Sequence, residues 1–353
     1  LDADTDGVEG LTYVWTPTQL ADVLGDADGR WAATTFEVTA RGTFEEGAST
    51  LQLPADPTEQ ARWESVRARL LAARSRRPQP ARDDKVVAAW NGLAVGALAE
   101  AGVALGHASW IAAAARAADF LVTTHLVDGR LRRTSRSGVV GTSAAVLEDY
   151  GCLADGLLAL HQATGEPRWL ALAAELLDVA VARFADPATP GAYFDTADDA
   201  ERLVRRPSDP SDNASPSGAS ALAGALLTAS ALTDHDRSTR YRDLVAEMLS
   251  RAGLLITRAP RFAGQWAAVA EAWLAGPVQV AIVGAGPAAD TLHAAAVAGV
   301  AGGSVVLAGE PDQAPLLAGR PLVAGAPAAY VCRGFVCDRP VTTVDDLTKA
   351  LAG

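Results

Sequence analysis

The stretch KVVAAWNGLAVGALAEAGVALGHASWIAAAARAADFLVTTH, residues 85–125, decides the fold. It divides into two helical segments rich in alanine and leucine, 85–105 and 108–125. Only a short link separates them, so the two helices are expected to be antiparallel neighbours. The stretch therefore predicts a helical hairpin.

The same design follows twice more along the chain. Segments 145–164 and 168–184 form a second predicted pair, and segments 217–233 and 237–254 form a third. A repeat of one helix pair per unit indicates an array of hairpins, which is either an open solenoid or a closed α/α toroid. Six pairs would close a toroid, so three predict a toroid that is incomplete at its N-terminus. The first residue, Leu1, is not Met, which suggests a fragment or a processed chain.

The residues before the hairpins are mixed. Segment 11–15 alternates like a strand, Thr16-Pro17 opens a short helix, and 29–47 contains strand-like pieces. A longer helix is expected over 59–76, and strand-like pieces recur in the later links, 129–140 and 192–205.

From residue 277 the pattern changes. A strand over 278–283, a helix over 288–298 and a strand over 304–307 predict a βαβ-like unit. Further strands are expected over 328–332 and at Val336, and a closing helix over 344–352 with Thr343 as its cap. We therefore expect three regions: lead-in loops and short strands over 1–57, the hairpin region over 58–276 and a small α/β unit over 277–353. The predicted fold class is mainly α.

Composition narrows the function classes. The net charge of −12 argues against a nucleic-acid partner, because such proteins need a basic face. No apolar run reaches the roughly 20 residues that cross a bilayer, so no membrane partner is expected. Three cysteines are sparse and odd in number, which favours a reducing cytoplasm. No cofactor is expected.

Polar motifs recur where the first helix of each pair begins. They are Trp90-Asn91-Gly92-Leu93, Glu148-Asp149-Tyr150 and Pro216-Ser217-Gly218. The repetition of polar residues at one structural position predicts a single shared site.

Several motifs together resemble the spermatogenesis-associated protein 20-like family. They are Leu1-Asp2-Ala3-Asp4, Tyr13-Val14-Trp15-Thr16, Asp83-Asp84-Lys85, the three helix-start motifs, and Ala329-Tyr330-Val331-Cys332 with Cys337 and Pro340. The resemblance spans the whole chain, although Ala219 stands where the family usually has Asn.

This resemblance implies a helical domain similar to six-hairpin glycosidases and N-acylglucosamine 2-epimerases. Family members also carry an N-terminal thioredoxin-like domain, and we expect no thioredoxin-like segment within residues 1–353. A thioredoxin-like segment or chain is therefore an expected partner.

In such a toroid the starts of the inner helices line a common funnel. We predict Glu148 and Asp149 as catalytic acid and base. An indole beside carboxylates and amides suits a sugar, so a small-molecule sugar is the expected ligand. The predicted substrate-binding residues are Asp2, Asp4, Trp15, Asp84, Trp90, Asn91, Asp212 and Ser217.

Simpler roles compete with this interpretation. Ser, Asp and Asn at helix starts often cap free backbone N–H groups, and Trp90 is also explained as a core residue. Two functions therefore stay open: a carbohydrate-active enzyme of the glycoside hydrolase or sugar epimerase kind, and a non-catalytic helical scaffold that serves a thioredoxin-like module.

Other candidate residues favour no further chemistry. None of the five histidines lies at a helix-start motif, and we expect His107, His161 and His235 at the surface. Gly284-Ala285-Gly286 follows a strand, but the third glycine of a dinucleotide-binding turn is absent, so a plain strand-to-helix turn is favoured.

The cysteines are expected to be structural or weakly redox-active. The spacing of Cys332 and Cys337 fits a disulfide or half of a zinc site, and we favour thiols because no second ligand pair follows. No metal site is predicted. Cys152 is expected to be a small buried hydrophobic residue.

Overall fold

The structure is a computed structural model that describes residues 1–334 and 336–352. It divides into two compact units, Leu1–Asp84 and Lys85–Gly353. Each unit has a hydrophobic core of its own.

The first unit is built on three helices. They are α1 (Pro17–Leu24), α2 (Asp26–Thr35) and α3 (Gln60–Arg74), accompanied by the short strands β1 (Asp4–Thr5) and β2 (Val8–Glu9) and the 3-10 turn η1 (Glu45–Gly47). The short helix predicted to open at Thr16-Pro17 is confirmed as α1, and Thr16 caps it: its hydroxyl accepts a hydrogen bond from Gln19 N, and the Gln19 side chain accepts one from Thr16 N.

Two predictions for this unit are wrong. Residues 26–35 form a helix instead of strand-like pieces, with Asp26 and Asp28 in the first turn, where carboxylates favour the helix dipole. Residues 11–13 form a turn, and only Trp15 makes a β-bridge, to Ser49. Packing overrides the local alternation in both stretches.

The helix α3 belongs with α1 and α2. Its buried residues Val66 and Leu70 share one core cluster with Trp15 and Leu20. The boundary that we predicted at residue 57 would separate α3 from these partners.

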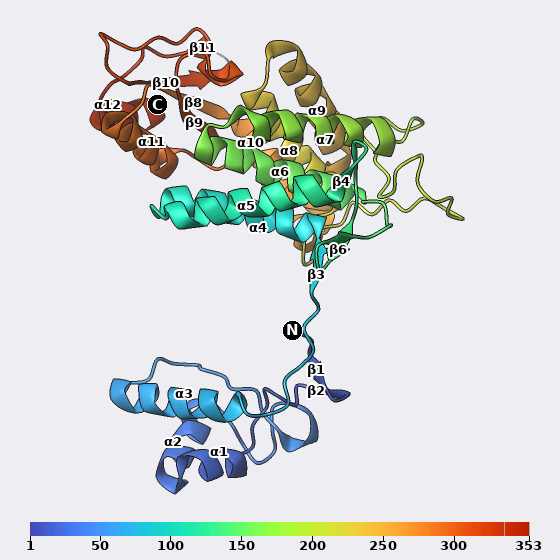
Figure 1. Ribbon diagram of the computed structural model, residues 1–353, viewed down its shortest axis with the longest axis vertical. Coiled ribbons are helices and arrows are strands. Elements are labelled where there is room, and N and C mark those ends of the chain that lie inside the picture. The colour runs from blue at the N-terminus through green and yellow to red at the C-terminus, as the bar shows by residue number, and fades with distance from the viewer. Residues whose placement is uncertain (335, 353) are drawn as a thin grey trace. The chain divides into compact units, whose positions relative to one another are not determined.

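The second unit begins with the predicted hairpins, which are confirmed (Figure 1). They are α4 (Ala88–Ala104) with α5 (Ala108–His125), α6 (Leu147–Thr164) with α7 (Pro167–Phe184), and α8 (Gly218–Leu232) with α9 (His235–Arg258). A further helix, α10 (Gly264–Ala275), follows the 3-10 turn η2 (Pro260–Phe262). Helices α4, α6, α8 and α10 pack side by side in one layer, and α5, α7 and α9 each cover their partner.

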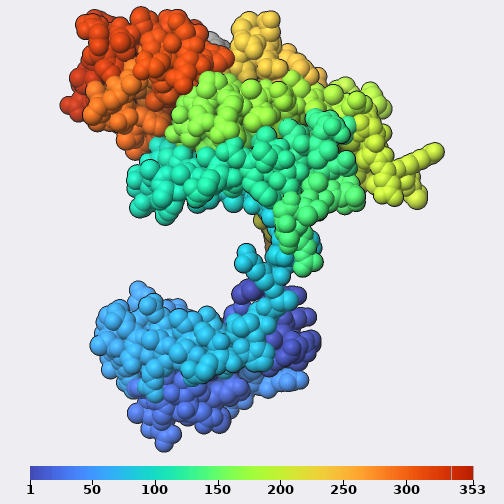
Figure 2. Space-filling model, viewed as in Figure 1, coloured from blue at the N-terminus to red at the C-terminus, as the bar shows by residue number. Residues whose placement is uncertain are grey.

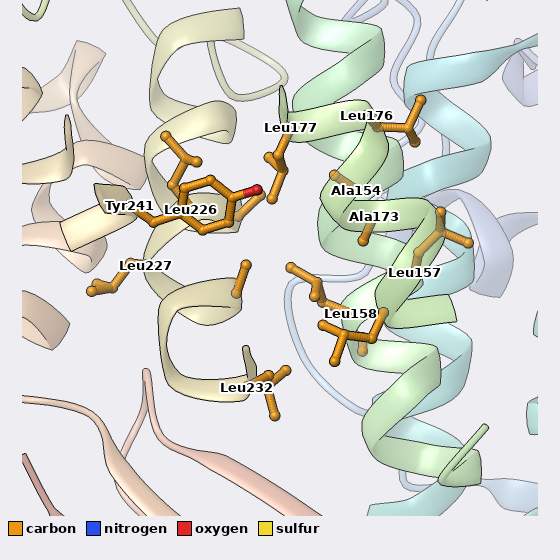
Figure 3. Close-up of a cluster of buried hydrophobic side chains, with 14 of the residues drawn as sticks. Ala154, Leu157, Leu158, Ala173, Leu176, Leu177, Leu226, Leu227, Leu232 and Tyr241 are labelled. Carbon is orange, nitrogen blue, oxygen red and sulfur yellow. The ribbon is translucent and has the colours of Figure 1, made fainter. Parts of the chain in front are cut away.

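Aliphatic side chains fill the space between the layers (Figure 3). Leu157 and Leu158 of α6, Leu177 of α7 and Leu226 of α8 are all buried there. The Tyr241 hydroxyl of α9 donates a hydrogen bond to Asp178 Oδ1 at 3.0 Å, which satisfies a polar group at the edge of this core.

Glycine allows the closest approach between α4 and α6. A Cβ atom at Gly92 would lie 2.6 Å from the carbonyl oxygen of Cys152, and one at Gly156 would lie 2.3 Å from the carbonyl oxygen of Gly92. The glycine of the first helix-start motif is therefore required for packing.

The links between hairpins differ from each other. The first carries β4 (Leu126–Val127), β5 (Arg130–Leu131), β6 (Thr134–Arg136) and β7 (Val139–Val140), and β6 pairs with both β7 and β3 (Lys85–Val87). The predicted strand-like pieces there are confirmed. In 192–205 only Tyr193 forms a bridge, to Ala185, and this long loop projects from the surface in Figures 1 and 2.

The predicted α/β unit is confirmed. Its sheet has the order β11-β10-β8-β9, and β9 is parallel to β8 while β10 is antiparallel to it. Its elements are β8 (Val278–Val283), α11 (Pro287–Gly299), β9 (Val305–Gly309), η3 (Pro315–Leu317), β10 (Ala328–Arg333), β11 (Val336–Cys337) and α12 (Val344–Ala352). Thr343 caps α12 as expected, since its hydroxyl accepts from Asp346 N.

Alternating residues give this sheet two apolar faces. Ala281 and Val283 pack into the core of the helical hairpins, while Val280 and Ile282 pack with Leu347 and α11. The sheet is thus held between the helical layer and α11–α12, and Figure 2 shows the orange and red surface of this part directly against the green helices.

Cys332 and Cys337 form a disulfide, so our preference for free thiols was wrong. The antiparallel register of β10 and β11 places the two residues opposite each other, a proximity that the spacing alone does not reveal. Cys152 is a buried free thiol, as predicted.

Within the described residues, no helix combines the length and apolar character that a membrane span requires.

Candidate functional site

The starts of α4, α6, α8 and α10 meet at one end of the helical layer. Asp149 Oδ1 in α6 accepts a hydrogen bond from Ala89 N in α4 at 3.0 Å. Gly218 of α8 packs against Glu148 of α6 so closely that a Cβ atom would lie 2.8 Å from Glu148 N. The repeated motifs therefore do occupy neighbouring positions.

Asp149 serves this junction and is fully buried. Its Oδ2 accepts from Val146 N at 2.9 Å and from the Arg133 guanidinium at 3.1 Å, in addition to the bond from Ala89. Burial raises the pKa of Asp149, while the bonds from Val146, Arg133 and Ala89 lower it. Both of its oxygens are bonded within the protein, so the side chain joins two helices and offers no surface to a substrate.

Asp212 plays the same kind of role between α8 and α10. Its Oδ1 accepts from Ser217 N at 2.9 Å and from the Ser220 hydroxyl, and its Oδ2 accepts from Gln265 N at 2.8 Å. Ser217 is the N-cap of α8, because its hydroxyl accepts from Ser220 N. Bonding to backbone N–H groups at helix starts, the simpler role that competed with substrate binding, therefore accounts for both Asp212 and Ser217.

The two predicted residues of α4 have separate roles. Asn91 donates to the carbonyl oxygen of Val87 at 2.9 Å, which ties the first turn to β3. Trp90 is 61% exposed, so it is not a core residue.

A polar hollow lies between the start of α6 and the loop that leads into α8. Val146, Glu148, Asp195, Asp209, Ser211, Asn213, Ser215, Pro216, Ser217 and Gly218 line it. Of the predicted site residues, Glu148 and Ser217 line this hollow; Trp90, Asn91, Asp149 and Asp212 do not.

Glu148 is the partly exposed member of its motif, with 20% of its side chain accessible. Its Oε1 accepts a hydrogen bond from the Ser215 hydroxyl at 2.8 Å, and its Oε2 lies 3.7 Å from Arg133 Nη2. The carboxyl group of Glu148 thus has a hydrogen-bond donor and a positive charge beside it. Arg133 thus contacts both acidic residues of the motif, a role that its place in an irregular link did not indicate.

Asp195 also lines the polar hollow, and the sequence analysis did not predict it as a site residue. Burial raises its pKa, a hydrogen bond from Asp209 N at 3.1 Å lowers it, and the charges of Asp209 and Glu148 raise it again. Its backbone carbonyl accepts from Leu147 N, so the loop is fastened to the start of α6. The hollow therefore holds Glu148 and Asp195 in different electrostatic surroundings.

Four predicted residues lie in the first unit. Trp15 is buried in its core, and the Arg77 guanidinium stacks 3.9 Å from the centre of its ring. Asp2 and Asp4 are exposed, with Asp4 paired to Glu9 in β1 and β2, and Asp84 is exposed at the end of the unit. Trp15 is a packing residue there.

The histidines lie outside the three helix-start motifs, as predicted, but His161 is buried instead of lying at the surface. Its Nδ1 lies 2.9 Å from the carbonyl oxygen of Glu166, and burial lowers its pKa. His125 is also buried, between Arg132 O and Ser135 Oγ. His107 and His235 are exposed as predicted. Both buried imidazole rings thus contact groups that are close to them in the chain.

A second, more apolar hollow lies at the opposite ends of α4 and α6, against α11 and β9. Glu100 and His293 are its ionisable lining residues. Burial raises the pKa of Glu100 and lowers that of His293, so both tend toward neutral forms.

Metal and dinucleotide chemistry find no support in the described part of the chain. No cluster of three or more His, Cys, Asp or Glu side chains suited to a metal occurs there. Gly284 and Gly286 both have positive φ angles, 119° and 85°, in the turn between β8 and α11. These angles account for the glycines without a ligand.

Comparisons with known proteins identify relatives over most of the chain. It is 32% identical to spermatogenesis-associated protein 20 of Mus musculus over 302 residues and 31% identical to that of Homo sapiens over 305 residues, each match covering 80% of this chain. The chain spans 38% of the length of these relatives. No family model matches the chain.

Among solved structures, sugar epimerases are similar over half of the chain. A cellobiose 2-epimerase from Spirochaeta thermophila matches with a TM-score of 0.39 and 16% identity, covering 51% of this chain and 45% of that one. A sugar epimerase from a ruminal bacterium matches with a TM-score of 0.41 and 15% identity, covering 51% and 46%. The resemblance drawn from the motifs is confirmed by sequence: this chain is homologous to the spermatogenesis-associated protein 20 proteins over four-fifths of its length.

Proposed function

We propose that this protein is a carbohydrate-active enzyme of the glycoside hydrolase kind, with the polar hollow at the starts of α6 and α8 as its active site. The observation that carries the proposal is the pair of carboxyl groups, Glu148 and Asp195, lining one hollow in different surroundings. Enzymes that cleave glycosidic bonds use two such groups, one as a protonated acid and the other as an ionised base or nucleophile.

Asp195 is the proposed general acid. Its raised pKa, caused by burial and by the neighbouring charges of Asp209 and Glu148, keeps the carboxyl protonated to a higher pH than an exposed aspartate. A proton held there is available to a leaving-group oxygen.

Glu148 is the proposed base or nucleophile. The Arg133 guanidinium at 3.7 Å and the Ser215 hydroxyl at 2.8 Å provide a positive charge and a hydrogen-bond donor beside its carboxyl oxygens. Asp149 takes the role of a positioning residue in this proposal, since it holds Arg133 at 3.1 Å beside Glu148.

The remaining lining supports a ligand rich in hydroxyl groups. Ser211, Asn213 and Ser215 belong to the loop that leads into α8, and their side chains bring hydroxyl and amide groups to the hollow. The exposed indole of Trp90, on the neighbouring helix start, is proposed as an outer surface for stacking a sugar ring.

A library of chromogenic glycosides tests the proposal, after binding has been screened by thermal shift with free sugars. Glu148→Gln and Asp195→Asn keep shape and remove charge, and each is expected to lower kcat by roughly 10²–10⁴-fold. Asp198→Asn is the matched control, because Asp198 is an exposed carboxylate paired with Arg183 outside the hollow. Full turnover by both hollow variants would exclude this site.

Asp209 offers a finer test. Its charge raises the pKa of Asp195, so Asp209→Asn is expected to move the high-pH loss of activity to lower pH. A product with an inverted carbon and an intact glycosidic bond would replace the hydrolase assignment with an epimerase.

A further inference from the structure

The disulfide between Cys332 and Cys337 is asymmetric in its exposure. Cys332 lies on β10 in the sheet and is buried, whereas Cys337 on β11 is exposed. An attacking thiolate in solution therefore has access to the sulfur of Cys337, and the sulfur of Cys332 is the one placed to leave.

A partly buried cation, Arg320, is directed at this disulfide. Nη2 of Arg320 lies 3.4 Å from Cys337 Sγ and 3.6 Å from Cys332 Sγ. The same guanidinium is held by the carbonyl oxygens of Leu316 at 2.6 Å and Ala318 at 3.1 Å. The geometry thus places the N–H donors of Arg320 on both sulfurs at once.

Arg320 has little else to balance its charge. Among the residues that the structure describes, no carboxylate lies within ion-pair distance of it, and its buried Nε has no hydrogen-bond partner. Burial also lowers its pKa, although a guanidinium stays protonated in proteins. A desolvated cation of this kind gains most from a nearby anion.

We propose that Cys332–Cys337 is a site of thiol–disulfide exchange with a dithiol reductant, in which Arg320 stabilises the thiolates that form. A thiolate of the reductant attacks Cys337 Sγ, the bond between the two cysteines breaks, and Cys332 leaves as a thiolate beside Arg320. The second thiol of the reductant then attacks its own mixed disulfide and releases Cys337. Two electrons pass to the cysteine pair, and the reductant becomes a disulfide.

The sulfur contacts set the expected size of the effect. Arg320 contacts a neutral disulfide in the oxidised form and a charged thiolate in the reduced form, so it favours reduction. Loss of a hydrogen bond to a thiolate is expected to change the equilibrium constant by at least about tenfold at a pH above the ordinary cysteine pKa of about 8.5. Arg320→Gln is therefore expected to shift the equilibrium at least about tenfold toward the disulfide, or about 30 mV for this two-electron couple.

Redox titration of the full chain with dithiothreitol tests this, with alkylation and mass spectrometry to count reduced cysteines. Arg333→Gln is the control, since Arg333 neighbours Cys332 in sequence but bonds to Asp338 and to the carbonyl oxygen of Ala350. The proposal expects a shift in the first variant and none in the second. Equal potentials for all three proteins would overturn it, as would a disulfide that is reduced only when the protein unfolds.

Variants that lack one cysteine of the pair test the order of attack, and each of them keeps the buried Cys152. Cys332→Ser leaves the exposed Cys337, whose thiolate is expected to attack oxidised glutathione, form a mixed disulfide and release one reduced glutathione. Cys337→Ser leaves the buried Cys332, which is expected to stay unmodified in the folded protein, and circular dichroism verifies that each variant is folded. Preferential modification of Cys332 would contradict the assignment.

Discussion

Substituting Gly92 by alanine tests the packing that brings the helix starts together. A Cβ atom at this position would lie 2.6 Å from the carbonyl oxygen of Cys152 and 2.7 Å from Leu153 Cα. Both are backbone atoms of α6, so no side-chain rotation relieves the clash, and α4 and α6 must move apart.

Two opposing contributions decide the result. Alanine favours a helix interior over glycine by about 1 kcal/mol. Overpacking a close contact costs about 1–3 kcal/mol or more, and a backbone contact belongs at the upper end of that range. We therefore expect Gly92→Ala to lower the free energy of unfolding by about 1–2 kcal/mol after the helix gain is subtracted.

Gly253→Ala is the matched control. Gly253 also lies inside a helix, α9, but nothing would lie within 4 Å of its Cβ atom. Only the helix preference remains there, so this variant is expected to be more stable by about 0.5–1 kcal/mol.

Urea and thermal unfolding, followed by circular dichroism, measure both variants against the parent protein. A change of 1 kcal/mol corresponds to about 2–4 °C in Tm for a domain of this size class. The two variants should move in opposite directions. Equal stabilisation by both alanines would refute the packing argument.

Three further outcomes are expected. Asp149→Asn should lower stability by about 2 kcal/mol in urea unfolding, because a buried N–H of Val146 or Ala89 then faces an amide group in place of a carboxylate; unchanged stability would contradict the joining role. Asp212→Ala should lower stability by roughly 2–4 kcal/mol, because the N–H groups of Ser217 and Gln265 lose their acceptor, and a loss no larger than that of the exposed Asp198→Ala would count against it. For Asp195 the folded pKa is raised, so its contribution to stability is present at low pH and declines as pH rises from about 4, the unfolded value, through the folded pKa; Asp195→Asn should remove this decline from a series of unfolding curves.

The polar motifs were sound guides to a position but weaker guides to chemistry. The first and third motifs contain packing glycines, Gly92 and Gly218, and the second contains Asp149, which joins neighbouring helices. Packing and joining repeat along the layer because the helices repeat, and this accounts for much of the pattern that we interpreted as a shared site. Of the predicted catalytic pair, only Glu148 reaches the hollow.

The sequence by itself determined the helices and strands of the second unit, because apolar periodicity and short links are local properties. Three hairpins, the strands β8 and β9 around α11, and the caps at Thr16 and Thr343 all follow from residues close to one another in the chain. Those features depend on interactions between residues that are close in the chain, so local sequence patterns predict them.

Only the tertiary structure decided which side chains share the hollow and which lie buried. Arg133 and Asp195 come from irregular links on either side of the α6–α7 hairpin, and no periodicity connects them to Glu148. The exposure of Cys337 and the approach of Arg320 to the disulfide depend likewise on how β11 and the loop after η3 fold onto β10. Contacts between distant loops arise from packing, and packing is a property of the whole fold.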